Sequence, residues 1–305
     1  MLTYHLPEGF RPWLRVGTCS WKYDSWKGLI YDPHRSYRAD DYLTDYARRL
    51  NSVEVDQWFW SLFSGSARLP DPRMVKTYGE AVPDDFVFSV KAPNALTLTH
   101  HYGAKSGAAG ERTGPPNPQF LSLDLLRKFL DILAPWGKKL GPVMFQFEYL
   151  NKQKMPSREA FQDKFGAFIR QAPGGLAYAL ETRNPNYLSP EFFSFLKELD
   201  VGFVGLEGYH MPSLASVFEK FDPHTSSFLV LRLHGTERQG IEKVTGEHWD
   251  KIAVPRPEAL QAAARIVRVN RRRKIMTFLN VNNHFEGSAP LTIERFLKEL
   301  EAAET

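Results

Sequence analysis

The sequence predicts an α/β fold, a single (β/α)8 TIM barrel with long βα loops at its C-terminal face, over residues 1–305. Three observations support this prediction. Eight short β-rich apolar runs recur, amphipathic helical segments separate most of them, and no repeat or linker interrupts the alternation. A barrel of this kind takes about 250 residues. An open doubly wound sheet is the alternative, but the sequence lacks a glycine-rich dinucleotide turn.

The predicted strands are short apolar runs, many rich in β-branched or aromatic residues, with turn residues around them. In chain order they are Leu14–Thr18, Ser52–Asp56, Phe86–Lys91, Pro142–Phe147, Ala177–Glu181, Val201–Leu206, Phe228–His234 and Ile275–Val281. The predicted helices have apolar residues at helical spacing. They are Asp40–Leu50, Leu121–Trp136, Arg158–Gln171, Pro190–Leu199, Arg256–Asn270 and Leu291–Ala302.

Two connections that leave the C-terminal ends of strands are unusually long. Ala92–Gln119 contains Gly-Ala-Ala-Gly and Gly-Pro-Pro-Asn-Pro, a composition that argues against regular structure. Gly235–Pro255 follows the seventh strand. In a barrel both connections lie over the active face. We expect the first to be a mobile lid, with a solvated surface insertion as the alternative.

Composition excludes several classes of protein. Hydrophobic residues make up 43% and charged residues 24% of the chain, as in ordinary globular proteins, which excludes a disordered or collagen-like chain. The net charge of +4 permits an anionic ligand but is small for a dedicated nucleic-acid-binding protein. Cys19 is the single cysteine, which excludes an intrachain disulfide. We find no apolar stretch of about 20 residues and no signal peptide, and therefore expect a cytoplasmic protein.

Polar residues gather near the C-terminal ends of the predicted strands. Because side chains alternate along a strand, residue parity separates the barrel interior from the helix-facing side. By parity, the interior set is Thr18, Ser20, Glu54, Asp56, Ser89, Lys91, Gln146, Glu181, Arg183, Arg232, His234, Asn280 and Asn282. Burying several charges costs several kcal/mol each unless they pair well. We therefore expect a functional pocket there, with a self-satisfied polar network as the alternative.

A set of motifs in fixed order covers nearly the whole chain. They are Val16-Gly17-Thr18-Cys19-Ser20-Trp21, Ser52-Val53-Glu54-Val55, Phe86-Val87-Phe88-Ser89-Val90-Lys91-Ala92-Pro93, Lys139-Leu140-Gly141-Pro142, Gln146-Phe147, Glu181-Thr182-Arg183, Leu231-Arg232-Leu233-His234-Gly235 and Asn282-Asn283-His284. This ordered set resembles the domain of unknown function 72 family, also called YecE-like. The resemblance implies a TIM-barrel-like fold. It implies no reaction, because the activity of the family is not established.

Three segments depart from the pattern of that family. Asp56-Gln57-Trp58-Phe59-Trp60 stands where the family has Asn-x-Thr-Phe-Tyr. Glu148-Tyr149 follows Phe147 in place of Pro-Pro, and Asn186-Tyr187 stands in place of Ser-Trp. We expect these changes to alter the wall of the pocket and therefore the substrate.

Four residues are the predicted catalytic groups: Glu54, Lys91, Glu181 and His234. The two glutamates would act as general acid and base if they lie about 5–10 Å apart across a glycosidic bond. Each could instead pair with a nearby cation. Lys91 would form a Schiff base if its neighbours lowered its pKa. With Glu54 nearby, we expect it to stay charged and to bind an anion.

The predicted substrate-binding residues are Trp21, Gln146, Arg183, Arg232, Asn282, Asn283 and His284. Barrels often bind phosphate at strands seven and eight, with help from a helix N-terminus. Gly287, Ser288 and Pro290 are typical of the start of such a helix. We therefore predict that Arg232 binds a phosphate or carboxylate. Trp21 is expected to stack on a ring or sugar.

We interpret the single cysteine and the basic run near the eighth strand as structural features, not as parts of the site. Cys19 has the opposite parity to Thr18, so we expect it to pack against the helices. The basic run 271–274 precedes the eighth strand and would lie on the face opposite the pocket. The histidines show no short-range metal-binding spacing, so we expect no metal and no cofactor.

Together these observations predict an enzyme that performs acid–base hydrolysis or lysis on a small anionic or sugar-like ligand. A nucleic-acid-binding or metallonuclease-like barrel that acts on damaged or single-stranded ends is a less favoured alternative. A non-catalytic small-molecule binder is the other. No membrane association is expected, and the sequence points to no protein partner.

Overall fold

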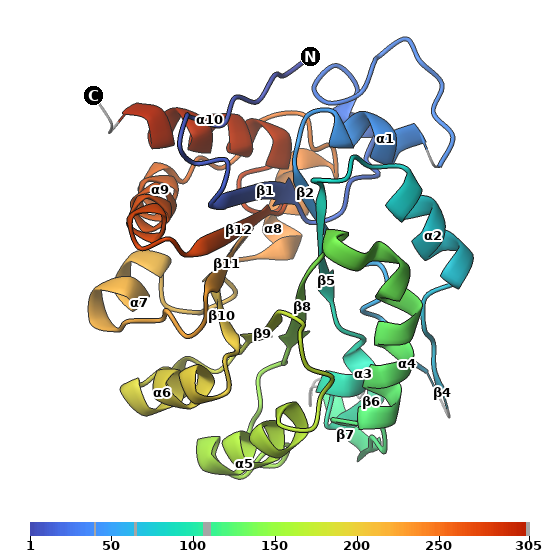
Figure 1. The fold of residues 1–305 in the computed structure, drawn as a ribbon, viewed down its shortest axis with the longest axis vertical. Helices are drawn as coiled ribbons and strands as arrows, with labels where there is room; N and C mark the ends of the chain where they lie inside the picture. The colour runs from blue at the N-terminus through green and yellow to red at the C-terminus, as the bar shows by residue number, and fades with distance from the viewer. Residues whose placement is uncertain (40, 64–65, 106–110, 303–305) are drawn as a thin grey trace.

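Eight parallel strands form one sheet in the computed structural model, which describes residues 1–39, 41–63, 66–105 and 111–302 (Figure 1). The sheet order is β1-β12-β11-β10-β9-β8-β5-β2. The strands are β1 (Leu14–Thr18), β2 (Ser52–Val55), β5 (Val87–Lys91), β8 (Leu140–Gln146), β9 (Tyr178–Glu181), β10 (Gly202–Gly208), β11 (Phe228–Gly235) and β12 (Met276–Val281). Each strand begins and ends within three residues of the bounds predicted for it. The eight predicted strands are thus confirmed.

The barrel closes between the first two strands. Cys19 and Glu54 form a parallel bridge, and the Ser20 amide donates to the Glu54 carbonyl at 3.0 Å. Gly17 permits this approach, because a Cβ atom there would lie 2.1 Å from the Ser52 carbonyl oxygen. A larger residue at this position would push β1 away from β2. The sheet is therefore a closed barrel, not the open doubly wound alternative.

Helices surround the barrel (Figure 1). They are α1 (Asp41–Ala47), α2 (Pro72–Glu80), α3 (Asn94–Thr97), α4 (Leu123–Leu133), α5 (Arg158–Ile169), α6 (Pro190–Glu198), α7 (Leu214–Lys220), α8 (Arg238–Thr245), α9 (Pro257–Arg272) and α10 (Ala289–Ala302), with 3-10 turns at Asp24–Trp26, Ala134–Lys139 and Pro185–Tyr187. Four helices begin at serine caps that accept a backbone N–H, namely Ser122, Ser157, Ser189 and Ser213. The helix predicted from Asp40 begins at Asp41, and Asp40 itself is outside the described residues.

Four of the described helices were not predicted: the four-residue α3 and the longer α2, α7 and α8. The three longer ones are at most nine residues long, and each buries only two side chains. So few buried positions give a weak periodic signal. No helix in the described part of the chain is long and apolar enough to cross a membrane.

The long connection after β5 is more regular than predicted. It contains α3 and an antiparallel hairpin of β6 (His100–Lys105) and β7 (Glu111–Pro116). The prediction of irregular structure is therefore wrong for this part. The Gly-Ala-Ala-Gly segment at 107–110 lies outside the described residues. A smaller hairpin of β3 (Leu62–Phe63) and β4 (Ser66–Ala67) follows β2.

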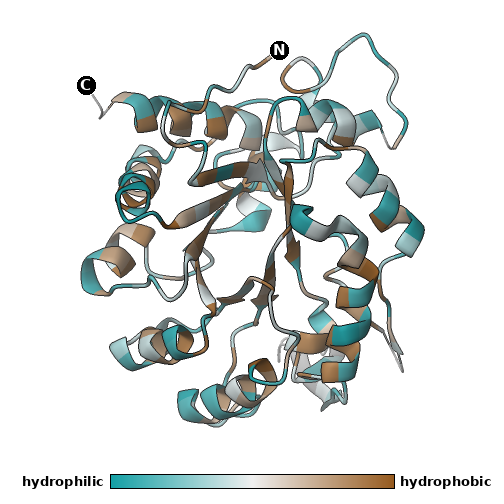
Figure 2. Ribbon diagram, in the orientation of Figure 1, coloured by the Kyte–Doolittle hydropathy of each residue, from teal (hydrophilic) through white to brown (hydrophobic). Residues whose placement is uncertain are grey.

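The barrel interior has two layers. The strands are largely hydrophobic and the outer helix faces largely hydrophilic (Figure 2). Near the N-terminal ends of the strands, an apolar cluster fills the interior with Met144, Ala179, Val204, Phe228, Val230 and Phe278. The opposite set of strand residues, such as Leu231, Leu233 and Leu279, packs against the helices in the main core. Nearer the C-terminal ends, the interior residues are polar, and these form the candidate site.

Candidate active site at the carboxyl ends of the barrel strands

A charged layer covers the apolar cluster inside the barrel. We use this name for five residues from five strands: Glu54, Gln146, Glu181, Arg232 and Asn280. Arg232 lies at the centre. Its Nε and Nη2 donate to the two Glu54 carboxylate oxygens at 2.7 and 2.6 Å, and Asn280 Nδ2 donates to Glu54 Oε2 at 3.1 Å. Strand parity correctly predicted that these side chains point inward at one end.

The guanidinium also reaches the other side of the layer. Arg232 Nη1 donates to Glu181 Oε2 and, at 3.1 Å, to Gln146 Oε1. Arg232, Glu54 and Glu181 are each at most 1% exposed. The predicted phosphate- or carboxylate-binding role of Arg232 is therefore wrong, because its donors already bind two buried carboxylates. The structure brings the two glutamates together, but on one shared cation.

Glu181 is held in its ionised form. Burial alone would raise its pKa, but the positive charges of Arg232 and Arg183 outweigh this effect and lower the pKa to about 2. A carboxyl group with this pKa has no proton to donate near neutral pH. The arrangement thus disfavours Glu181 as the general acid of a two-carboxylate glycosidase.

Lys91 ends β5 beside the charged layer and is only 8% exposed. Its Nζ lies 3.7 Å from the centroid of the Phe59 ring. Burial and the nearby Arg232 lower the pKa of Lys91 to about 8, and Glu54, Asp56 and Glu181 offset only part of this. We expected Glu54 to keep this lysine in its charged form. Glu54 does raise this pKa, but desolvation outweighs its attraction, so the net shift is downward, although the lysine stays mostly protonated at pH 7.

His234 and Cys19 meet at the end of the charged layer. Cys19 Sγ lies 3.5 Å from His234 Nε2, while His234 Nδ1 has no partner among the described residues. Burial and then Arg232 lower the pKa of His234, so its ring is neutral. Burial and then Glu54 raise the pKa of Cys19, which keeps it as a thiol. Cys19 and His234 therefore meet as a neutral thiol and a neutral imidazole.

The predicted orientation of Cys19 is wrong. We expected it to face the helices and Thr18 to face the interior. Instead Thr18 Oγ1 shares a hydrogen bond of 2.9 Å with the Tyr46 hydroxyl on α1, and Cys19 points into the barrel. In β1 the polar residue therefore faces the helices, because a polar side chain of the helix layer, Tyr46, forms a hydrogen bond with it.

Cys19, Glu54 and His234 also have ligand atoms within 4.8 Å of one another. Both Glu54 oxygens already accept from Arg232, so a metal ion there would lie beside a guanidinium. Like charges at this distance repel each other. The three residues are therefore a poor metal site.

A mouth cavity of about 470 Å³ lies on the same face of the barrel. Its lining is Phe59, Trp60, Leu98, Tyr102, Gln146, Glu148, Tyr149, Arg183, Pro185, Tyr209 and His210. Trp60, Tyr102 and Tyr149 are unusually exposed for aromatic side chains, at 63%, 52% and 58%. Two of these three, Trp60 and Tyr149, lie in segments where the sequence departs from its family pattern. Those departures therefore identified part of the cavity wall before the structure was known.

Trp21 does not form this wall. Its side chain is buried and packs edge-to-face on Tyr78 with ring centroids 5.0 Å apart. The predicted stacking role of Trp21 is therefore wrong. Trp60 is instead an exposed wall residue.

Arg183 joins the mouth cavity to the charged layer. Its Nε donates to Glu181 Oε1 at 2.8 Å, and its guanidinium lies 4.0 Å from the centroid of the Tyr209 ring. The side chain is 18% exposed and lines the cavity. Gln146 likewise lines the cavity and bonds Arg232. Arg183 and Gln146, both predicted to bind substrate, thus lie between the mouth cavity and the charged layer and contact both.

Asn282, Asn283 and His284 build the turn from β12 into α10. Asn283 Oδ1 accepts from the Ala289 amide at the start of the helix, at 2.9 Å. His284 Nε2 lies 3.1 Å from Glu242 Oε1 on α8, and Asn282 Oδ1 accepts from the His284 amide. None of the three lines the mouth cavity. The helix start at 287–290 is as predicted, but its first free amide is capped by the protein itself.

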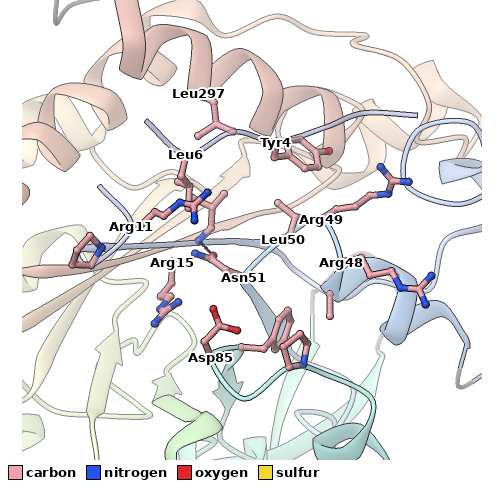
Figure 3. Close-up of a pocket in the computed structure, with 15 residues that line it drawn as sticks. Tyr4, Leu6, Arg11, Arg15, Arg48, Arg49, Leu50, Asn51, Asp85 and Leu297 are labelled. Atoms are coloured by element: carbon pink, nitrogen blue, oxygen red, sulfur yellow. Dashed lines mark hydrogen bonds between the residues drawn. The ribbon is translucent and has the colours of Figure 1, made fainter. Parts of the chain in front are cut away.

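A second cavity of about 450 Å³ lies at the other end of the barrel (Figure 3). Arg11, Arg15, Asn51 and Asp85 are among its lining residues. Catalytic residues in TIM barrels come from the C-terminal strand ends, whereas the N-terminal face contributes to stability. We therefore place the candidate active site at the mouth cavity.

A closed parallel barrel with charged and aromatic residues at the carboxyl ends of its strands defines a TIM-barrel protein. The chain belongs to the family described as protein of unknown function DUF72, which matches residues 15–305. A DUF72 family protein from Thermotoga maritima superposes with a TM-score of 0.63 and 20% identity, over 95% of this chain and 99% of that one. A DUF72 family protein from Enterococcus faecalis gives a TM-score of 0.63 and 19% identity, over 94% and 95%. No curated protein matches the sequence.

Proposed function

We propose that this protein is an enzyme that binds a small, negatively charged, sugar-like substrate in the mouth cavity and acts on it by acid–base chemistry. Lysis fits the site better than hydrolysis. The observation that carries the proposal is the position of Arg183, which lines an aromatic cavity and also pairs with Glu181 in the buried charged layer. Arg183 would therefore contact both the charged group of the substrate and a carboxylate of the charged layer.

Aromatic walls and one guanidinium suit a sugar acid or sugar phosphate. The faces of Trp60 and Tyr149 offer apolar surface on which a ring can stack. The planar fork of Arg183 can form charge-assisted hydrogen bonds with a carboxylate or phosphate. A neutral sugar would use only the walls, so we expect charge to decide affinity.

The ionisation states favour proton abstraction by Lys91. Its pKa of about 8 makes it a base near neutral pH. Burial raises the pKa of Asp56, so this carboxyl group is the better proton donor of the site. Glu54 and Glu181 hold Arg232 and thereby set the field around Lys91. Abstraction of a proton followed by departure of a leaving group is a lyase reaction.

Calorimetric titration with glucuronate and with glucose tests the proposal. We expect glucuronate to bind more tightly than glucose, and Arg183→Met to weaken glucuronate binding roughly 10- to 100-fold, the loss of one charge-assisted bond. The control is Arg272→Met, an exposed arginine at the end of α9 on the opposite face. Equal glucuronate affinities for wild type and Arg183→Met would contradict the proposal.

A further inference from the structure

Lys91 differs from the three charged residues of the charged layer beside it. Arg232 makes four hydrogen bonds, and Glu54 and Glu181 are each paired. Within the described part of the chain, Lys91 Nζ has no hydrogen bond and no ion pair, only the Phe59 ring 3.7 Å away. A buried ammonium group without acceptors is costly. Packing gives no reason to keep a lysine here, which points to chemistry.

The surroundings of Lys91 lower its pKa and so increase the fraction of neutral amine. Arg232 and His234 come from β11, Glu54 and Asp56 from the end of β2, and Glu181 from β9. Burial and Arg232 together outweigh the three carboxylates, so the pKa of Lys91 falls to about 8. At pH 7 about a tenth of such a lysine is unprotonated, against less than a thousandth for an ordinary one. Desolvation beside another cation is a known way to activate an amine nucleophile.

Lys91 also lies one side chain away from the mouth cavity. The Phe59 ring lines the cavity and covers Nζ. β5 lies between β2 and β8, so the amine stands between the Glu54 and Gln146 sides of the barrel. Arg183 and Phe59 line the same cavity, so a ligand held by Arg183 would lie beside the ring that covers Nζ. Burial and this ring keep most of the lysine side chain out of water.

We propose that Lys91 forms an imine with the carbonyl group of an aldehyde or oxo acid substrate. This inference rests on the proposed function, because it places the anionic group of the same substrate at Arg183. It narrows the substrate class to compounds with a reactive carbonyl group. It also replaces simple proton abstraction by covalent catalysis.

The step balances without an added oxidant or reductant. The Nζ lone pair forms a bond to the carbonyl carbon, and the carbonyl oxygen takes up a proton to give a carbinolamine. The nitrogen gives up one of its two protons at this stage. A second proton on the oxygen then lets it leave as water, while the nitrogen lone pair forms the C=N bond of a protonated imine that keeps one N–H. Asp56, whose charge interacts with Lys91, can supply and recover protons. The protonated imine then withdraws electrons from the adjacent bond, which is the bond that a lyase breaks.

Reductive trapping tests the inference on the intact protein. Wild-type protein is incubated with glyoxylate, pyruvate or glyceraldehyde in the presence of sodium cyanoborohydride, and the modified lysines are identified by peptide mass spectrometry. We expect at least one probe to modify Lys91 about tenfold faster or more than Lys152, an exposed lysine in the connection after β8. The rate should rise with pH around 8, and Phe59→Leu should increase it by exposing Nζ.

The outcomes separate this inference from the proposed function. Modification of Lys91 no faster than Lys152 for every probe, in protein that still binds glucuronate through Arg183, overturns the imine and leaves the proposed function standing. Absence of both selective modification and Arg183-dependent binding overturns both. Selective modification that is weakened in Arg183→Met supports both.

Discussion

Single residues of the charged interior show two different outcomes of burial. For Glu181, the attraction of two arginines exceeds the cost of burial, and its pKa falls to about 2. For Lys91, burial and repulsion by Arg232 exceed the attraction of three carboxylates, and its pKa falls to about 8. The first residue contributes stability that is lost only as pH falls from its ordinary range toward 2. The second lowers stability at neutral pH.

We expect Lys91→Met to stabilise the protein at pH 7 by about 1–3 kcal/mol. The unfolded chain binds a proton on this lysine up to about its ordinary pKa of 10.5, and the folded protein only up to about 8. Wild-type stability therefore rises with pH between these values. Urea unfolding should show that the difference shrinks at pH 10. A gain that is the same at pH 7 and pH 10, or is matched by Lys152→Met, would contradict this account.

Most inward-facing charges could be predicted from the sequence, because they alternate with apolar residues along their strands. Cys19 could not. Its neighbour Thr18 is polar, yet it faces the helices because the Tyr46 hydroxyl, 28 positions away in the chain, bonds it. The net direction in which the pKa of Lys91 shifts could not be predicted either, because it depends on the position of Arg232. Both failures come from partners that no local pattern identifies.

Among the elements, the hairpin of β6 and β7 was the largest departure from the prediction. Glycine and proline in the segment indicated irregular structure. In the hairpin, Gly114 lies against the His101 carbonyl oxygen, where a Cβ atom would come within 2.4 Å. Pro115 and Pro116 end an edge strand, where a missing N–H costs little. The same residues that argued against a strand permit this one.

Asn117 attaches the end of the hairpin to α3 and the residue that caps it, and we expect Asn117→Ala to loosen the hairpin. Its Nδ2 donates to the Ala95 and Leu98 carbonyls at 2.8 and 2.6 Å, and the residue is buried. Removing the amide leaves two acceptors unpaired and costs about 1–3 kcal/mol. Because Leu98 and Tyr102 line the mouth cavity, glucuronate affinity should also fall.

Hydrogen exchange of residues 94–105 and calorimetry measure the two effects of Asn117→Ala. The matched control is Asn151→Ala, which removes an exposed side chain that accepts from the Gln153 and Lys154 amides. Faster exchange confined to Asn117→Ala is expected. Unchanged exchange and affinity would show that the hairpin is held by other contacts.

At the scale of the whole molecule, one guanidinium connects strands from around the barrel. Arg232 on β11 binds Glu54 on β2, Gln146 on β8 and Glu181 on β9. The eight strands and their inward polar faces followed from alternation in the sequence. The pairing did not, because Glu54 and Arg232 are 178 positions apart and any carboxylate of the set could have met any cation. Closure of the barrel decides the partners.

Removal of this cation alone should cost more stability than removal of the whole charged network. Arg232→Met should destabilise the protein by about 3–5 kcal/mol, because Glu54 and Glu181 are left buried without their shared cation. The triple variant Glu54→Gln, Glu181→Gln, Arg232→Met removes the charges together, so urea unfolding should show that it recovers most of this loss. Equal losses in both variants would mean that shape, not charge, fixes this layer.

The triple variant also separates stability from function. It should still bind glucuronate more weakly than wild type, because Arg183 loses the Glu181 carboxylate that orients its Nε at 2.8 Å. Calorimetry on the refolded triple variant measures this loss against the Arg272→Met control. Recovery of stability without recovery of binding is the result expected if the charged layer serves the site. If wild-type affinity returned together with stability, the layer would be a structural support alone.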